Sequence, residues 1–167
     1  MKNPIFYTYL NSSIGELLLA ADETGLISVG FPAGKMARRH ESHWILDPDR
    51  FRDVVQQLNA YFAGELRNFN VRLALYGTNF QARVWKALQD IPYGATSSYA
   101  DVAASIGSPK ASRAVGAANA RNPVPIIVPC HRVIGKSGNM VGFGGGIKAK
   151  QQLLSLERLS LQHDLSG

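Results

Sequence analysis

The chain of 167 residues contains a single cysteine, Cys130. One cysteine excludes an intrachain disulfide and a zinc site built from several thiolates. No apolar run approaches the roughly 20 residues of a membrane-spanning helix, and the N-terminus lacks the long apolar segment of a signal peptide. We therefore expect a cytoplasmic protein whose thiol stays reduced.

Charge is scarce and unevenly distributed. Charged residues make up 18% of the chain and hydrophobic residues 46%, which is typical of a globular protein. Residues 77–167 carry ten Lys and Arg against four Asp and Glu, whereas residues 1–76 carry eight of each, so the net charge of +6 lies in the C-terminal part. This surplus favours a polyanionic partner such as nucleic acid, with a solvated basic surface as the alternative.

The N-terminal part has the pattern of a small α/β domain, which we expect to span residues 1–76. Strand-like runs at 5–10, 16–21 and 26–31, separated by turn residues, predict an antiparallel meander. An amphipathic helix follows, with its apolar face at Phe51, Val54, Val55, Leu58, Tyr61 and Phe62. Alternating apolar residues from Phe69 to Leu75 predict a further strand.

From residue 77 to 167 the pattern becomes helical. Thr78 and Gln81 form a capping box at the start of one helix, and Ser98 with Asp101 starts a second. After a break at residues 107–109, a third helix is expected from about 110 to 120, and a last one over 147–159. The second and third helices have the spacing of a helix-turn-helix, although short helical hairpins in ordinary cores look similar. The overall fold class is α+β.

The predicted third helix presents an almost bare surface. Its members are mostly small, and they include Ser112, Ala114 and Gly116, with Arg113 as its one large polar residue besides the initial lysine. Major-groove readers carry Arg, Asn or Gln, whereas a bare helix approaches closely and suits the minor groove. The alternative is a helix packed tightly against another helix.

The strongest local motif surrounds the cysteine. It reads Pro129-Cys130-His131-Arg132-Val133-Ile134 and follows the apolar run Ile126-Ile127-Val128. Free cysteine is often a small buried hydrophobic residue, and its other role is that of a nucleophile. The adjacent histidine and arginine favour the nucleophile.

From Asn79 to Glu157 the chain resembles the O6-alkylguanine-DNA alkyltransferases. The resemblance is carried by Phe80-Gln81-x-x-Val84-Trp85, Ile91-Pro92-Tyr93-Gly94, Ser98-Tyr99, Ser112-Arg113-Ala114-Val115-Gly116, Asn122-Pro123, the motif around Cys130, and Gly142-Phe143-Gly144-Gly145-Gly146. It implies a ribonuclease H-like N-terminal domain and a winged helix-turn-helix C-terminal domain. It also implies repair of duplex DNA, in which a flipped O6-alkylguanine, with O4-alkylthymine as a second candidate, gives its alkyl group irreversibly to Cys130 in a single turnover.

The same resemblance assigns residue roles. Cys130 is the alkyl acceptor, His131 its general base acting through a water molecule, and Glu157 the acid that orients the histidine. Tyr99 donates to guanine N3 as the alkyl group departs. Asn122 holds the segment that carries the cysteine.

The remaining implied residues contact DNA or line the pocket. Arg113 enters the base stack in place of the flipped nucleotide, and Ser112, Ala114 and Gly116 face the minor groove. Pro125, Val128, Phe143 and Gly144 surround the flipped base. The sequence departs from the family at three of these positions. Phe143 stands where the family commonly has Tyr, Gly144 where some members have Ser, and Ser112 where Ala is common. These differences bear on which O6 adducts the protein accepts, especially bulky ones.

We expect no cofactor and no obligate protein partner, and a monomer is expected. Some members of the family have a zinc site in the N-terminal domain, but this chain has no second cysteine, which excludes a cysteine-containing site of that kind. His40 and His43 alone are too sparse for a metal site. Two alternatives remain: a damage-marking relative without chemistry, against which Cys130 speaks, and a helix-turn-helix transcription factor with Cys130 as a redox switch. The latter leaves Tyr99, Arg113 and Glu157 unexplained.

Overall fold

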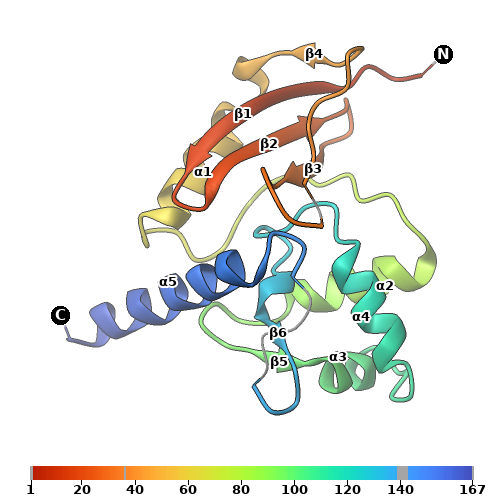
Figure 1. Ribbon diagram of the computed structural model, residues 1–167, viewed down its shortest axis with the longest axis vertical. Helices are drawn as coiled ribbons and strands as arrows, with labels where there is room; N and C mark the ends of the chain where they lie inside the picture. Colours follow the sequence, from red (N-terminus) through yellow and green to blue (C-terminus); the bar gives the residue numbers. More distant parts are fainter. Residues whose placement is uncertain (1, 36, 139–142, 167) are drawn as a thin grey trace.

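A four-stranded sheet builds the top of the molecule in Figure 1. The structure is a computed structural model that describes residues 2–35, 37–138 and 143–166. The strand order is β3-β2-β1-β4, antiparallel except for the parallel pair β1 and β4, with bounds β1 Phe6–Ser12, β2 Gly15–Ala21, β3 Leu26–Gly30 and β4 Ile45–Leu46. Leu17 and Leu19 point into the main core and Leu18 into a smaller cluster with Trp44, so β2 is buried on both faces. The predicted meander is confirmed.

One helix covers the inner face of this sheet. A 3-10 turn, η1 (Pro48–Phe51), leads into α1 (Arg52–Phe62), whose Val54, Leu58 and Tyr61 are buried. The chain turns away two residues after the helix, at Gly64, whose φ is +76°, and a Cβ at that position would lie 2.6 Å from Ser160 Oγ. The glycine therefore permits both the left-handed turn and the close approach of the C-terminal helix.

The strand predicted over residues 69–75 is wrong. The segment makes a single bridge, Leu26 to Leu73, through hydrogen bonds from Leu26 N to Arg72 O and from Ala74 N to Leu26 O, both 2.9 Å. Its apolar side chains are partly buried against the main core. The alternation thus reflects packing on the core, while only one point of the backbone reaches the sheet edge.

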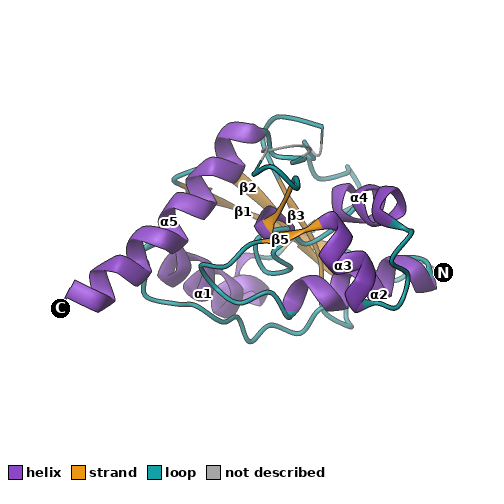
Figure 2. Cartoon of the chain, turned by 90° about the horizontal axis from the view of Figure 1, so that it is seen from below, coloured by secondary structure: helices purple, strands orange, loops and turns teal. Residues whose placement is uncertain are grey.

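Helices dominate the rest of the chain, in agreement with the α+β prediction. Figure 2 shows α2, α3 and α4 grouped on one side and α5 on the other. Their bounds are α2 Asn79–Gln89, α3 Tyr99–Ser105, α4 Ser112–Ala120 and α5 Ile147–Ser166, and two short strands, β5 (Ser97–Ser98) and β6 (Val133–Ile134), pair in parallel. The last helix is longer than the predicted 147–159.

Local signals explain where these helices begin. Thr78 and Gln81 form the complete capping box at α2, and Ser98 accepts a hydrogen bond from Asp101 N at α3. Gly107, with φ +75°, turns the chain between α3 and α4. Among the described residues, no helix is long and apolar enough to cross a membrane.

Candidate functional site

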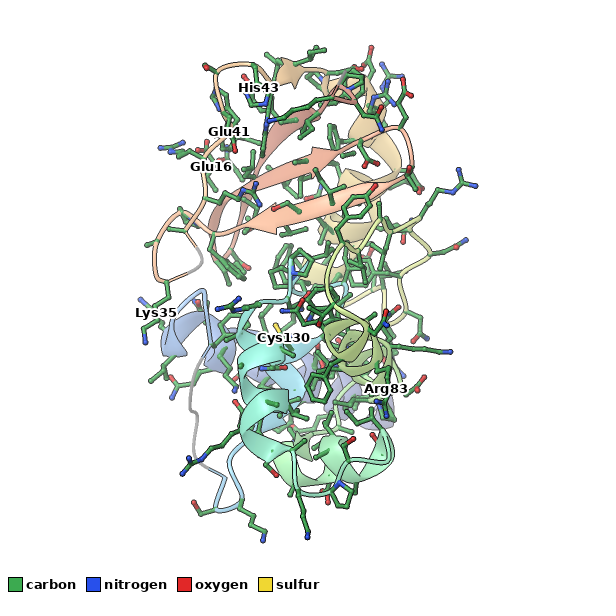
Figure 3. All side chains as sticks on the ribbon, turned by 90° about the vertical axis from the view of Figure 1, so that its right-hand side faces the viewer. Glu16, Lys35, Glu41, His43, Arg83 and Cys130 are labelled. Atoms are coloured by element: carbon green, nitrogen blue, oxygen red, sulfur yellow. The ribbon has the colours of Figure 1, made fainter. Side chains whose placement is uncertain are left out.

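Cys130 lies in the interior, where the helices meet the sheet-bearing half of the molecule (Figure 3). It begins the 3-10 turn η2 (Cys130–Arg132), and only 2% of its surface is exposed. Asn122, also buried, donates from Nδ2 to Val128 O over 2.8 Å and accepts from Val124 N over 3.0 Å. These two bonds tie the end of α4 to the segment that carries the cysteine.

The segment before the cysteine is strained. Ile126 has φ +76°, a conformation that a β-branched residue rarely adopts, and its side chain is fully buried. Pro125 and Val128, on either side, form a bridge and are both buried. The surrounding structure therefore holds this backbone in one shape and presents Cys130 from it.

The Cys130 thiol is protonated at neutral pH. Burial raises its pKa to about 11, although a hydrogen bond from Asn122 and the charge of Lys150 act in the opposite direction. A thiol with this pKa needs a base before it can act as a nucleophile.

The neighbouring histidine has the arrangement of such a base. His131 is fully buried, and its Nε2 lies 2.6 Å from Glu157 Oε2. Its Nδ1 is buried and has no hydrogen-bond partner among the described residues. Burial lowers the pKa of His131, and the bond to Glu157 offsets part of this shift. The ring is thus neutral at neutral pH, with Nε2 carrying the proton towards the carboxylate and Nδ1 left as an acceptor.

Glu157 is held by donors on four residues from three parts of the chain. Besides His131, Arg132 donates from Nε to Oε1 (2.8 Å) and from Nη2 to Oε2 (3.2 Å), Tyr61 OH donates to Oε2 (2.6 Å), and Gly94 N donates to Oε1 (3.1 Å). Burial alone raises the pKa of Glu157, but the bonds and charges of these partners outweigh it and lower the pKa to about 2. The carboxylate is therefore ionised despite its complete burial.

Three residues at the site, Tyr61, Arg132 and Lys150, have no role predicted from the sequence. Lys150 is fully buried and donates from Nζ to Val133 O over 2.6 Å. Lys150, Leu153 and Glu157 follow i, i+3, i+7 spacing on α5, so the pattern could have placed both charged side chains on the buried face. For Tyr61, local sequence carries no signal, because its partner is 96 residues away.

The helix-turn-helix brings Tyr99 close to Cys130. Tyr99 begins α3 and is half-buried, and burial together with the nearby Cys130 raises its pKa. Its ring lies against α4 at Gly116, where a Cβ would be 3.8 Å from the ring. Arg113 and Ala114 are exposed and Ser112 is partly buried, all on α4. The bare surface of α4 is therefore beside the cysteine.

The glycine-rich loop packs against the N-terminal half. Phe143 is buried with its ring 5.3 Å from that of Phe31, and Gly144 is buried where its carbonyl approaches Gly34. Gly142 lies outside the described residues. The structure thus brings Phe143 and Gly144 to the boundary of the two halves.

The two loop histidines are engaged in other contacts. His40 stacks on Tyr7 with ring centroids 4.1 Å apart and bonds Tyr9 OH, and His43 pairs with Glu41. Over the residues that the structure describes, no three His, Cys, Asp or Glu side chains gather to hold a metal ion.

Comparison with known proteins gives a consistent family match. Residues 5–75 match the ribonuclease-like domain of the 6-O-methylguanine DNA methyltransferase family, and residues 79–159 match its DNA-binding domain. A methylated-DNA–protein-cysteine methyltransferase of Methanosarcina acetivorans is 52% identical over 92% of this chain and 98% of its own length. A protein of the same name from Mycobacterium tuberculosis is 51% identical over 97% of this chain and 98% of its own.

A solved structure is similar in shape as well. The crystal structure of Mycobacterium tuberculosis OGT in complex with DNA superposes with a TM-score of 0.87 at 52% identity, covering 93% of this chain and 94% of that one.

Proposed function

The chain belongs to the 6-O-methylguanine DNA methyltransferase family, whose activity is repair of DNA by transfer of an alkyl group from O6-methylguanine to a cysteine, and we propose that Cys130 is the acceptor. The observation that carries this proposal is the burial of Cys130, its sequence neighbour His131 and Glu157, with His131 bonded to Glu157. The thiol is protonated, and the neutral histidine that follows it has its Nε2 2.6 Å from an ionised carboxylate. This arrangement generates a thiolate only when the base accepts its proton.

The reaction proceeds as a displacement at the alkyl carbon. His131 Nδ1 takes the Cys130 proton through a water molecule, and Glu157 stabilises the imidazolium. The sulfur forms a bond to the alkyl carbon while the bond from that carbon to O6 breaks. The electron pair passes into the guanine ring, and Tyr99 OH donates a proton to N3. The thioether has no leaving path, so each molecule reacts once.

DNA binding uses the bare surface of α4. Ser112, Ala114 and Gly116 let the helix backbone approach the minor groove, and Arg113 enters the base stack where the damaged nucleotide has flipped out. The exposure of Arg113 on the same helix that contacts Tyr99 supports this role. O4-alkylthymine is a second candidate base.

The flipped base occupies a pocket beside the cysteine. Pro125 and Val128 supply apolar surface and main chain, and Phe143 and Gly144 form the adjoining loop. Asn122 keeps the cysteine-bearing segment in register with α4 through its bonds to Val124 and Val128.

The chain divides at about residue 77 into an N-terminal α/β domain, 1–76, and a C-terminal DNA-binding and alkyl-acceptor domain, 77–167. The change from sheet to helices at this point supports the division. We place the protein in the cytoplasm, because a reducing compartment keeps Cys130 a thiol.

A titration of methylated DNA tests the acceptor role. Increasing amounts of duplex with one O6-methylguanine are incubated with a fixed amount of protein, and the restored guanine is counted. We expect repair to stop at one guanine per protein molecule, and Cys130→Ser to bind the duplex but restore none. Continued repair beyond one equivalent, or repair by Cys130→Ser, would contradict the proposal.

A further inference from the structure

Tyr61 reaches the active site from the other half of the chain. It lies in the last turn of α1, is fully buried, and donates its hydroxyl to Glu157 Oε2 over 2.6 Å. The same oxygen lies 2.6 Å from His131 Nε2. One carboxylate oxygen therefore accepts hydrogen bonds from both Tyr61 and His131.

The orientation of Glu157 does not depend on this hydroxyl. Arg132 donates a hydrogen bond to each carboxylate oxygen, and Gly94 N donates one to Oε1. With three bonds fixing the plane of the carboxylate, the tyrosine acts mainly on the electron density at Oε2. Each further donor on one oxygen weakens the bonds that this oxygen accepts from the others.

Tyr61 and Glu157 are both fully buried, and aromatic rings surround the tyrosine. The Tyr61 ring lies 5.5 Å from that of Phe62, 5.4 Å from Phe69 and 6.2 Å from Tyr93. In such an environment each hydrogen bond has a larger electrostatic effect than it has in water.

We propose that Tyr61, acting through Glu157, sets the base strength of His131. By donating to Oε2, Tyr61 reduces the pull of the carboxylate on the Nε2 proton and so keeps His131 neutral, ready to accept a proton from Cys130. The inference rests on the proposed function, and it makes α1 of the N-terminal half part of the proton-transfer machinery.

Other titratable and charged groups lie near His131 and Tyr61. Arg132 and Lys150 disfavour the imidazolium, the Cys130 thiol lies beside the His131 backbone, and Tyr93 adjoins Tyr61. Removal of the Tyr61 hydroxyl leaves all four in place, so a change in the proton affinity of His131 is attributable to that hydroxyl.

The matched pair of variants is Tyr61→Phe and Tyr93→Phe. Tyr93 belongs to the same aromatic cluster, but its buried hydroxyl has no hydrogen-bond partner among the described residues. The rate of methyl transfer from O6-methylguanine duplex is measured against pH under single-turnover conditions. For Tyr61→Phe we expect the acid limb of the profile to shift to higher pH by about half a unit or more. The rate at the plateau should stay within about threefold of that of the unmodified protein.

A merely structural role would lower the plateau and leave the limb in place. The inference would be overturned if the acid limb of Tyr61→Phe stayed in place or shifted to lower pH. It would also be overturned if Tyr93→Phe showed the same shift as Tyr61→Phe. An NMR titration of the His131 ring on unreacted protein gives the same pKa difference without any transfer. Consequently, failure of the unmodified protein to accept a methyl group would contradict the proposed function alone.

A fluorinated tyrosine covers the case in which Tyr61→Phe does not fold. Substitution of 3,5-difluorotyrosine at position 61 retains the ring and makes the phenol a stronger donor. The acid limb and the NMR pKa of His131 are then expected to move downward. An upward shift or no shift would overturn the inference.

Discussion

Arg132 and Glu157 form a bidentate ion pair inside the protein, with Nε to Oε1 at 2.8 Å and Nη2 to Oε2 at 3.2 Å. The Arg132 side chain is 7% exposed and that of Glu157 not at all. Arg132 also donates from Nη1 to Ile91 O. The pair thus anchors the turn after Cys130 to α5 and to the end of α2, and each charge depends on the other for compensation.

Glu157→Gln is expected to destabilise the protein by about 3–5 kcal/mol, because it leaves the buried Arg132 charge without its partner. Urea denaturation of both proteins measures the difference. Glu16→Gln is the control, since Glu16 pairs with Arg39 on the surface and its loss should leave the midpoint unchanged. Equal effects of the two substitutions would contradict a buried, mutually dependent pair.

Acidification is expected to destabilise the fold in two steps. The pKa of His131 is lower in the folded than in the unfolded state, so the unfolded chain takes up its proton first and stability falls as the pH drops below about 6.5. For Glu157 the same reasoning places a further loss between pH 4.5 and about 2.

The first step can be isolated by substitution. Urea midpoints measured from about pH 8 to about pH 5 should fall for the unmodified protein and stay flatter for His131→Gln. His40→Gln, which alters a histidine stacked on Tyr7, serves as the control. The same slope in the unmodified protein and His131→Gln would show that His131 is not buried in its neutral form.

Cys130 is expected to resist small alkylating reagents in the resting protein. Burial raises its pKa to about 11, so at neutral pH the thiolate fraction is at least about 100-fold below that of free cysteine. Iodoacetamide labelling, followed by mass, measures the rate. Labelling after unfolding in guanidinium should proceed at the ordinary rate, and equally fast labelling of the folded protein would contradict a protonated resting thiol.

The parts of the fold predicted from sequence are those encoded by neighbouring residues. The capping box at Thr78, the turn at Gly107 and the strands of the N-terminal meander each depend on groups close together in the sequence, and all are present in the structure. The predicted strand at 69–75 failed because alternation reports burial and not hydrogen bonding.

The candidate site was predicted only where residues adjoin in sequence or match a motif. Cys130 and His131 are adjacent, and Glu157 came from resemblance. Tyr61 and Lys150 reach the site through the packing of α1 and α5, which involves contacts between distant segments. A local pattern can place such residues on the buried face of a helix, but it carries no information about which distant segment they contact.

Arg113→Ala is expected to slow repair of duplex DNA by about tenfold or more while leaving the reaction with free O6-methylguanine base unchanged. The guanidinium is needed only where a flipped base leaves a space in the stack. Single-turnover rates on both substrates measure the contrast. Arg158→Ala is the control, because Arg158 is exposed and belongs to α5, a helix that lies away from α4 (Figure 2). Equal losses on both substrates for Arg113→Ala would refute the role in the stack.

The central claim is that Cys130 is consumed as the alkyl acceptor. Its most direct test is the mass of the intact protein and of its Cys130 peptide after incubation with excess O6-methylguanine duplex. The account predicts that every active molecule gains the mass of one CH₂ group, located on Cys130, with none on Cys130→Ser. An unchanged mass with DNA binding intact, or a methyl group on any other residue, would contradict it.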